Sequence, residues 1–202
     1  MKIVEEVTLI SAGGYAGSKD WLLTRKSLYK AIRKVDWPSG SGKFLIYPES
    51  GKRRGEGNGV TPIKVDLMLE LKSQGWELEN RIPIATRIQT GALDAVLHTP
   101  HGPVALEWET GNISSSHRAL NKMALGLMKG ILAAGILVVP SGPLAYFLTD
   151  RIGNYPELIP YLDLWRAIPC EAGVLEIVVI EHDGTSTDVP RIPKSTSGRA
   201  LE

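Results

Sequence analysis

The chain has 202 residues, enough for one domain that buries about 70% of the surface its unfolded form exposes. A formal net charge of +1 excludes a histone-like protein that coats nucleic acid through bulk charge. The single cysteine, Cys170, excludes an intrachain disulfide framework and is expected to be a free, buried thiol. Four scattered histidines lack the paired spacing of a zinc site, and no signal peptide or membrane span is indicated. We therefore expect a single cytoplasmic domain over residues 1–202.

Two helices and one strand are expected in the first part of the chain. Residues 18–35 have the apolar periodicity of an amphipathic helix. Its apolar stripe consists of Trp21, Leu28, Ile32 and Val35. A strand is expected over residues 42–48. Thr61 would cap a second helix that runs to Ser73, with Pro62 at its first position.

Short apolar runs and helical segments alternate in the rest of the chain. The runs that contain Asp94 and Glu107 are joined by the turn-like sequence TPHGP and should form a hairpin. The later expected elements are a helix over 114–129, a buried strand ending at Val139, short helices over 142–152 and 156–165, and a strand over 174–181. This alternation predicts an α/β fold, in which a mixed central β-sheet is flanked by helices. A short C-terminal tail is expected from about residue 184 to 202.

Three carboxylates are expected to converge at the hairpin. Side chains alternate along a strand, so Glu107 and Glu109 share one face, and the hairpin brings Asp94 beside them. Neighbouring carboxylates repel one another unless a cation neutralises them, and hard oxygen ligands favour Mg²⁺ or Mn²⁺ over zinc. The pattern predicts metal-assisted phosphodiester chemistry. A solvated strand face is the alternative that the residues alone leave open.

A cluster of three cations lies in the glycine-rich loop ESGKRRGEGNG. Lys52, Arg53 and Arg54 are expected to bind the phosphates of a nucleic-acid backbone. A solvated loop explains the same residues equally well.

Several long segments resemble the BamHI family of type II restriction endonucleases, in the same order and with similar spacing. They are ETGNISSSHRALNKMALGL at 109–127, LAYFLTDRIGNYPELIPYLDL at 144–164 and VPRIPKSTSG at 189–198, preceded by WPSGSGKFLIYP and NGVTPIK. The resemblance implies a restriction-endonuclease-like core of the PD-(D/E)xK superfamily. It also implies Mg²⁺-dependent hydrolysis of both strands of DNA at the palindrome GGATCC.

The resemblance assigns the metal site to Asp94, Glu107 and Glu109. Glu109 stands where many nucleases of the superfamily carry a lysine, and a carboxylate there would activate the attacking water. The implied cofactor is Mg²⁺, with Mn²⁺ as a substitute and Ca²⁺ supporting DNA binding without turnover.

Two further catalytic positions are implied upstream of the hairpin. One is a glutamate that joins the metal site, placed at Glu79 with Glu77 as the alternative. The other is Lys64, which matches a lysine near the scissile phosphate, although a solvated lysine in a first helical turn would look the same.

Five residues match the base-reading surface of the family. They are Asn112, Ser114, Arg118, Asp150 and Arg151. Aspartate can accept a hydrogen bond from cytosine N4 and arginine can pair bidentately with guanine, so Asp150-Arg151 would read a G·C pair. A surface ion pair at Asp150-Arg151 and a helix cap at Asn112 are the structural explanations.

Cutting both strands of a palindrome requires a twofold homodimer. The helix face formed by Leu120, Met123, Ala124 and Leu127 is either core or dimer seam, and the resemblance implies the seam. Two alternatives to the main reading remain. One is a sequence-specific DNA-binding module without nuclease activity, and the other is a related nuclease with a degenerate site.

Overall fold

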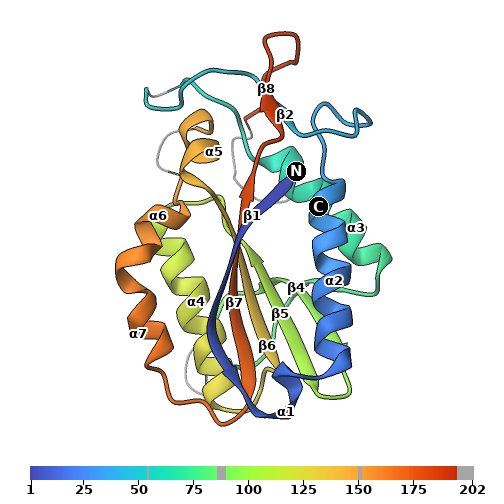
Figure 1. Cartoon of the computed structure of the whole chain (residues 1–202), viewed down its shortest axis with the longest axis vertical. Coiled ribbons are helices and arrows are strands. Elements are labelled where there is room, and N and C mark those ends of the chain that lie inside the picture. The colour runs from blue at the N-terminus through green and yellow to red at the C-terminus, as the bar shows by residue number, and fades with distance from the viewer. Residues whose placement is uncertain (54, 86–89, 150–151, 195–202) are drawn as a thin grey trace.

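The computed structural model of the protein describes residues 1–53, 55–85, 90–149 and 152–194. Its centre is a six-stranded sheet with the order β1-β7-β6-β5-β4-β3 (Figure 1). The strands are β1 (Lys2–Ala12), β3 (Glu77–Asn80), β4 (Leu93–Thr99), β5 (Gly102–Trp108), β6 (Ala134–Pro140) and β7 (Gly173–Glu181). Strands β5, β6 and β7 run parallel, and the other pairings are antiparallel. The predicted mixed sheet is confirmed.

Helices cover both faces of the sheet (Figure 1). One face carries α2 (Lys19–Lys34) and α3 (Thr61–Ser73), and the other carries α4 (Ile113–Met128), α6 (Tyr155–Leu158) and α7 (Leu162–Arg166). The remaining elements are α1 (Gly13–Ala16), α5 (Gly142–Phe147), a 3₁₀ turn η1 (Ile159–Tyr161) and the small parallel pair β2 (Leu45–Ile46) and β8 (Gly184–Thr185). None of the helices in the described ranges is long and apolar enough to cross a membrane.

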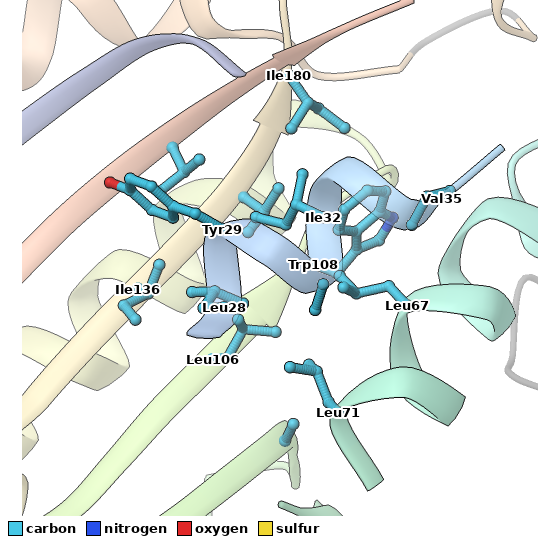
Figure 2. Packing of buried hydrophobic residues seen from close by; sticks show 14 of the residues in the cluster. Leu28, Tyr29, Ile32, Val35, Leu67, Leu71, Leu106, Trp108, Ile136 and Ile180 are labelled. Atoms are coloured by element: carbon cyan, nitrogen blue, oxygen red, sulfur yellow. The ribbon is translucent and has the colours of Figure 1, made fainter. Parts of the chain in front are cut away.

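The first core layer lies between the sheet and helices α2 and α3. Figure 2 shows Leu28 and Ile32 of α2 and Leu71 of α3 directed toward Leu106 of β5. The whole predicted stripe of α2 is buried, and Ser18 caps the helix by accepting a hydrogen bond from Trp21 N. Each buried Leu or Ile contributes about 1.5–3 kcal/mol, which fixes both helices on the sheet.

The second core layer lies under α4. Its apolar face, Leu120, Met123, Ala124 and Leu127, is buried against the opposite side of the sheet. The expectation that this face forms a dimer seam is wrong, because the monomer already uses it as core. The outward side of α4 instead presents Arg118, Asn121 and Met128 to solvent.

Several boundaries differ from the sequence expectations. The strand expected over 42–48 shrinks to two residues, because the Asp36 carboxylate accepts hydrogen bonds from Gly40 N and Gly42 N and folds the preceding segment into a turn. The helix expected over 142–152 ends at Phe147. Cys170 is half-buried rather than fully buried.

The C-terminal segment packs into the core as far as it is described. Ile192 is buried, and its backbone N donates to Asn58 Oδ1 at 3.1 Å. The Asn58 amide, itself 0% exposed, donates to Tyr47 O and Phe147 O at 2.9 Å each. One buried amide thus ties the loop before α3 to the end of α5 and to the C-terminal segment.

Candidate active site and nucleic-acid interface

Strand β5 carries two glutamates to the carboxyl ends of the parallel strands. Glu107 belongs to β5 and is 5% exposed, whereas Glu109 follows the strand and is half-buried. Glu109 N donates to Val138 O of β6 at 3.0 Å, so the chain stays in register with the sheet beyond the end of β5. Ligands of α/β proteins typically bind at this end of parallel strands.

Asp94 lies beside Glu107 on the neighbouring strand β4. Its Oδ2 accepts a hydrogen bond from Trp108 N at 2.8 Å. The Asp94 N–H in turn donates to Glu107 Oε2 at 3.4 Å, a long contact. These two contacts hold the carboxylates of Asp94 and Glu107 next to each other across the hairpin, where the sequence predicted them.

Two lysines approach the carboxylates from opposite layers of helices. Lys64 of α3 pairs with Asp94, with 2.6 Å between Nζ and Oδ1. Lys122 of α4 forms an ion pair with Glu107 Oε1 and donates to the carbonyl oxygens of Ala92 and Gly91 at 3.0 and 3.3 Å. The sequence indicated Lys64 through the family resemblance, but it gave no signal for Lys122.

The pKa of Glu109 lies well above the usual glutamate range. Burial, followed by the neighbouring charges of Glu107 and Asp94, raises its pKa to about 7 against the lowering effect of Lys64. Burial, followed by the charge of Asp94, also raises the pKa of Glu107, while Lys122 lowers it. Three acids therefore share a site in which two lysines offset only part of the negative charge.

The donor set suits a hard divalent cation, because it consists of carboxylate oxygens. In the described ranges, however, no group of three His, Cys, Asp or Glu side chains lies in a ready metal-binding arrangement. Lys64 instead binds Oδ1 of Asp94, and Lys122 binds Oε1 of Glu107. The assignment of Asp94, Glu107 and Glu109 as metal ligands stays a prediction. The negative charge and oxygen donors of these three side chains suit a hard divalent cation.

Glutamine at position 109 should stabilise the metal-free protein at a pH above the ordinary glutamate pKa of 4.5 and have little effect below it. Glu109 takes up a proton on folding, since its pKa rises from 4.5 to about 7, so stability is lost as the pH increases through that range. The full shift corresponds to about 3 kcal/mol, and partial solvent access reduces the expected gain of Glu109→Gln to about 1–2 kcal/mol at pH 8. Urea unfolding in chelator at pH 4.5 and pH 8 measures it. A gain of the same size at both pH values would contradict the shifted acidity.

The two candidate upstream glutamates lie on the edge strand β3. Leu78 and Asn80 pair with Ala95 and Leu93, so the register places Glu79 opposite Asp94. Glu77 pairs instead with Val96, and its carboxylate lies 3.5 Å from His98 Nε2. Both glutamates are exposed, and the register favours Glu79 as the residue beside the site.

The first described base-reading segment is the start of α4, directly after Glu109. Asn112 is the N-cap, and its Oδ1 accepts a hydrogen bond from Ser115 N at 3.2 Å. Arg118 donates to Ser115 Oγ at 3.3 Å. Asn112, Ser114 and Arg118 are all exposed. The cap explains Asn112 in the free protein and still leaves these side chains accessible to DNA.

The loop after α5 reaches the same place. Gly153 N donates to Gly111 O at 2.8 Å, and a Cβ at Gly153 would lie only 2.8 Å from Ile113 Cα. Two of the predicted base-reading residues, Asp150 and Arg151, lie outside the described residues. Of the residues described nearby, Gly153 lies against the N-terminus of α4.

The basic loop is anchored to α5 and to Thr149 (Figure 1). Gly51 N donates to Tyr146 O at 2.9 Å, and Thr149 N donates to Asn58 O at 2.8 Å. Lys52 and Arg53 are exposed, and Lys52 Nζ lies 5.2 Å from the ring centroid of Tyr146. Arg54 lies outside the described residues. The described part of the basic loop is thus fixed against α5 and Thr149.

Comparisons with known proteins identify the family of this chain. Residues 1–199 match the family described as restriction endonuclease BamHI. The type II restriction enzyme OkrAI of Oceanobacter kriegii is 42% identical over 201 residues, which cover 100% of both chains. The type II restriction enzyme BamHI of Bacillus amyloliquefaciens is 33% identical over 190 residues, or 90% of this chain and 85% of that one. The crystal structure of restriction endonuclease BglII with a DNA 16-mer shares the fold, with a TM-score of 0.63 at 12% identity over 91% of this chain and 79% of that chain. The chain therefore belongs to the BamHI family and is a type II restriction endonuclease, a site-specific deoxyribonuclease.

Proposed function

We propose that this endonuclease hydrolyses both strands of double-stranded DNA at GGATCC, as a homodimer, with Mg²⁺ as cofactor and in the cytoplasm. The observation that carries the proposal is the contact of Asp94 with Glu107 across the hairpin, directly beside the exposed start of α4. The carboxylates assigned to the metal and the first side chains assigned to base reading then lie within one continuous stretch of the chain, residues 94–118.

The chain's own residues divide the chemistry among them. Asp94, Glu107 and Glu109 would hold the divalent cation, and the register favours Glu79 as a further ligand. When bound, such an ion supplies Lewis-acid polarisation of the scissile phosphate. Glu109 is the carboxylate that we assign to accept the proton of the attacking water. Mn²⁺ should replace Mg²⁺, and Ca²⁺ should support binding with little turnover.

The recognition site follows from the residues kept at matched positions. Asn112, Ser114, Arg118, Asp150 and Arg151 retain the types found in the family's base-reading motifs. Arginine paired with guanine O6 and N7, and aspartate paired with cytosine N4, specify an outer G·C pair. The cations of the basic loop, Lys52, Arg53 and Arg54, would contact the backbone without reading sequence.

Exchange of the outer base pair of the DNA tests the proposed recognition sequence. We expect cleavage of a duplex with GGATCC and at least about 30-fold slower cleavage of the same duplex with AGATCT, because each half-site loses about 1–3 kcal/mol. Rates are compared under single-turnover conditions in Mg²⁺. Equal cleavage of both duplexes would favour an enzyme with a degenerate site and contradict GGATCC.

The dimer would use the outward side of α4, since the inner side is core. A hollow of about 500 Å³ opens there, lined by residues that include Thr90, His117 and Leu125, and Met128 nearby is 50% exposed. A twofold partner would cover the part of this surface around Leu125 and Met128, leave Ser114 and Arg118 open to DNA, and place the second active site on the second strand.

Stoichiometry on a short duplex tests the dimer. A 12-base-pair duplex with one GGATCC site, about one helical turn long, should bind two chains. Light scattering of the complex in Ca²⁺ measures its mass. One chain per duplex at saturating protein would contradict the homodimer.

A further inference from the structure

Lys122 links three parts of the active site. It projects from α4, one helical turn after Arg118, and forms an ion pair with Glu107 of β5. Its Nζ also donates to the carbonyl oxygens of Ala92 and Gly91, which lie immediately before β4 and Asp94. One side chain from the reading helix therefore contacts one predicted metal ligand and the segment that leads to another.

The position of Lys122 is not that of an ordinary surface lysine. Its side chain is only 10% exposed and the Glu107 side chain 7% exposed. Removing an ammonium group from water costs several kcal/mol unless acceptors replace the lost hydration, and three acceptors surround Nζ here. Lys129, the residue that follows α4, provides a contrast, because it is exposed and its Nζ donates to a loop carbonyl, that of Ile84, at 2.8 Å.

The two oxygens of Glu107 have different environments. Oε1 is bound by Lys122, whereas Oε2 lies 3.4 Å from the backbone N of Asp94. A buried carboxylate that is anchored through one oxygen has little freedom to rotate. The second oxygen then stays directed toward Asp94.

We propose that Lys122 is a positioning residue for metal binding, which anchors Glu107 through Oε1 and keeps Oε2 directed toward Asp94 for the divalent cation. The inference rests on the proposed metal-dependent function. Partners in the outer sphere of a metal site commonly fix the orientation of its ligands, and their loss costs about 10–100-fold in metal affinity or activity.

A competing role predicts the opposite sign. If Lys122 merely substituted for the cation in the metal-free protein, its removal would leave three carboxylates with one lysine and would tighten metal binding. Anchoring predicts weaker binding, because an unanchored Glu107 must be ordered again when the ion enters. The direction of the change separates the two roles.

The experiment is a Mn²⁺ titration of the DNA-free protein, in which electron paramagnetic resonance detects unbound Mn²⁺. Lys122→Met and Lys122→Gln should each raise the apparent Kd about tenfold or more. Lys122→Arg, which keeps a cation near the carboxylate and the carbonyls, should recover most of the loss. Lys129→Met serves as the matched control and should remain within about twofold of the wild type.

A second measurement separates positioning from a loss of structure. Affinity for a GGATCC duplex in chelator should stay within about threefold of the wild type in all four variants, since Lys122 is not assigned to a base or phosphate. Unchanged or tighter Mn²⁺ binding in both Lys122→Met and Lys122→Gln would overturn the proposal. So would a parallel loss of Mn²⁺ and DNA binding that Lys122→Arg fails to rescue. Failure of the wild type itself to bind Mn²⁺ would instead refute the proposed metal dependence.

Discussion

Replacing Glu107 by alanine should abolish cleavage and leave specific DNA binding intact. The Glu107 carboxylate lies beside Asp94 and is assigned to the metal, whereas the base-reading side chains start at Asn112. Losing a direct ligand should cost more than the 10–100-fold typical of an outer-sphere partner, so we expect at least about a 10³-fold lower cleavage rate. Single-turnover cleavage in Mg²⁺ and duplex binding in chelator measure the two properties separately.

A second variant controls for the buried charge of Lys122, which the alanine variant would leave without a carboxylate partner. Without Glu107, the Lys122 ammonium loses its carboxylate partner in a site where both side chains are buried. Glu107→Gln keeps the size and an acceptor oxygen but lacks the charge, and it should be equally inactive. Full cleavage by either variant would remove Glu107 from the metal site.

Replacing Arg151 by alanine should weaken specific binding far more than binding to random DNA. The expectation rests on the motif FLTDRIGN. Gly153 of this motif donates a backbone hydrogen bond to Gly111, next to the start of α4. One bidentate contact to guanine contributes about 1–3 kcal/mol per half-site, so a twofold dimer should lose about 30-fold to 10⁴-fold in affinity for GGATCC. Titrations against specific and random duplexes at several salt concentrations provide the comparison.

Removing the basic loop cluster is the matched control for Arg151. Alanine at Lys52, Arg53 and Arg54 should lower specific and random binding together and flatten the salt dependence, because backbone contacts release counterions at any sequence. If Arg151→Ala instead behaved like the loop variant, Arg151 would contact phosphate, and the assigned reading surface would be wrong.

Local sequence signals were sufficient for the helices that position the site. Helices α2 and α4 have a clear 3.6-residue period and capping residues, Ser18 and Asn112, whose side chains bind the first turns in the structure. The hairpin was also predictable, because the turn at residues 99–103 separates two apolar runs. Asp94 and Glu107 could therefore be placed side by side from sequence.

The edge strands β1 and β3 were not predicted, for a physical reason. Strand β1 carries Glu5 and Glu6 and contains two register shifts against β7, which disrupt the alternation that marks a strand. Tertiary partners compensate the charges, since Tyr155 OH donates to Glu5 at 2.8 Å and Arg25 pairs with Glu6. Strand β3 has four residues and includes Glu79 at a φ of 50°. Such strands depend on contacts that no local pattern records.

Two buried glutamates show why a carboxylate in the core is ambiguous from sequence. Glu176 is 1% exposed and accepts hydrogen bonds from Arg25 Nε at 2.9 Å and Tyr29 OH at 2.6 Å. Strong donors from α2 satisfy that group within the fold, which is the signature of a structural ion pair. Glu107 shares its burial but lies beside Asp94 and Glu109. Only the folded arrangement distinguishes these cases, and the pairing of Lys122 with Glu107 likewise requires α4 to pack on the sheet.

The most direct test of the account is to map the ends that the purified protein produces on a plasmid of known sequence. We predict that in Mg²⁺ every double-strand end falls at a GGATCC site, and that chelator or Glu107→Gln leaves the plasmid uncut. Ends at GGATCC in chelator would contradict the role of the carboxylates. Ends at unrelated sequences in Mg²⁺ would contradict the assigned recognition surface.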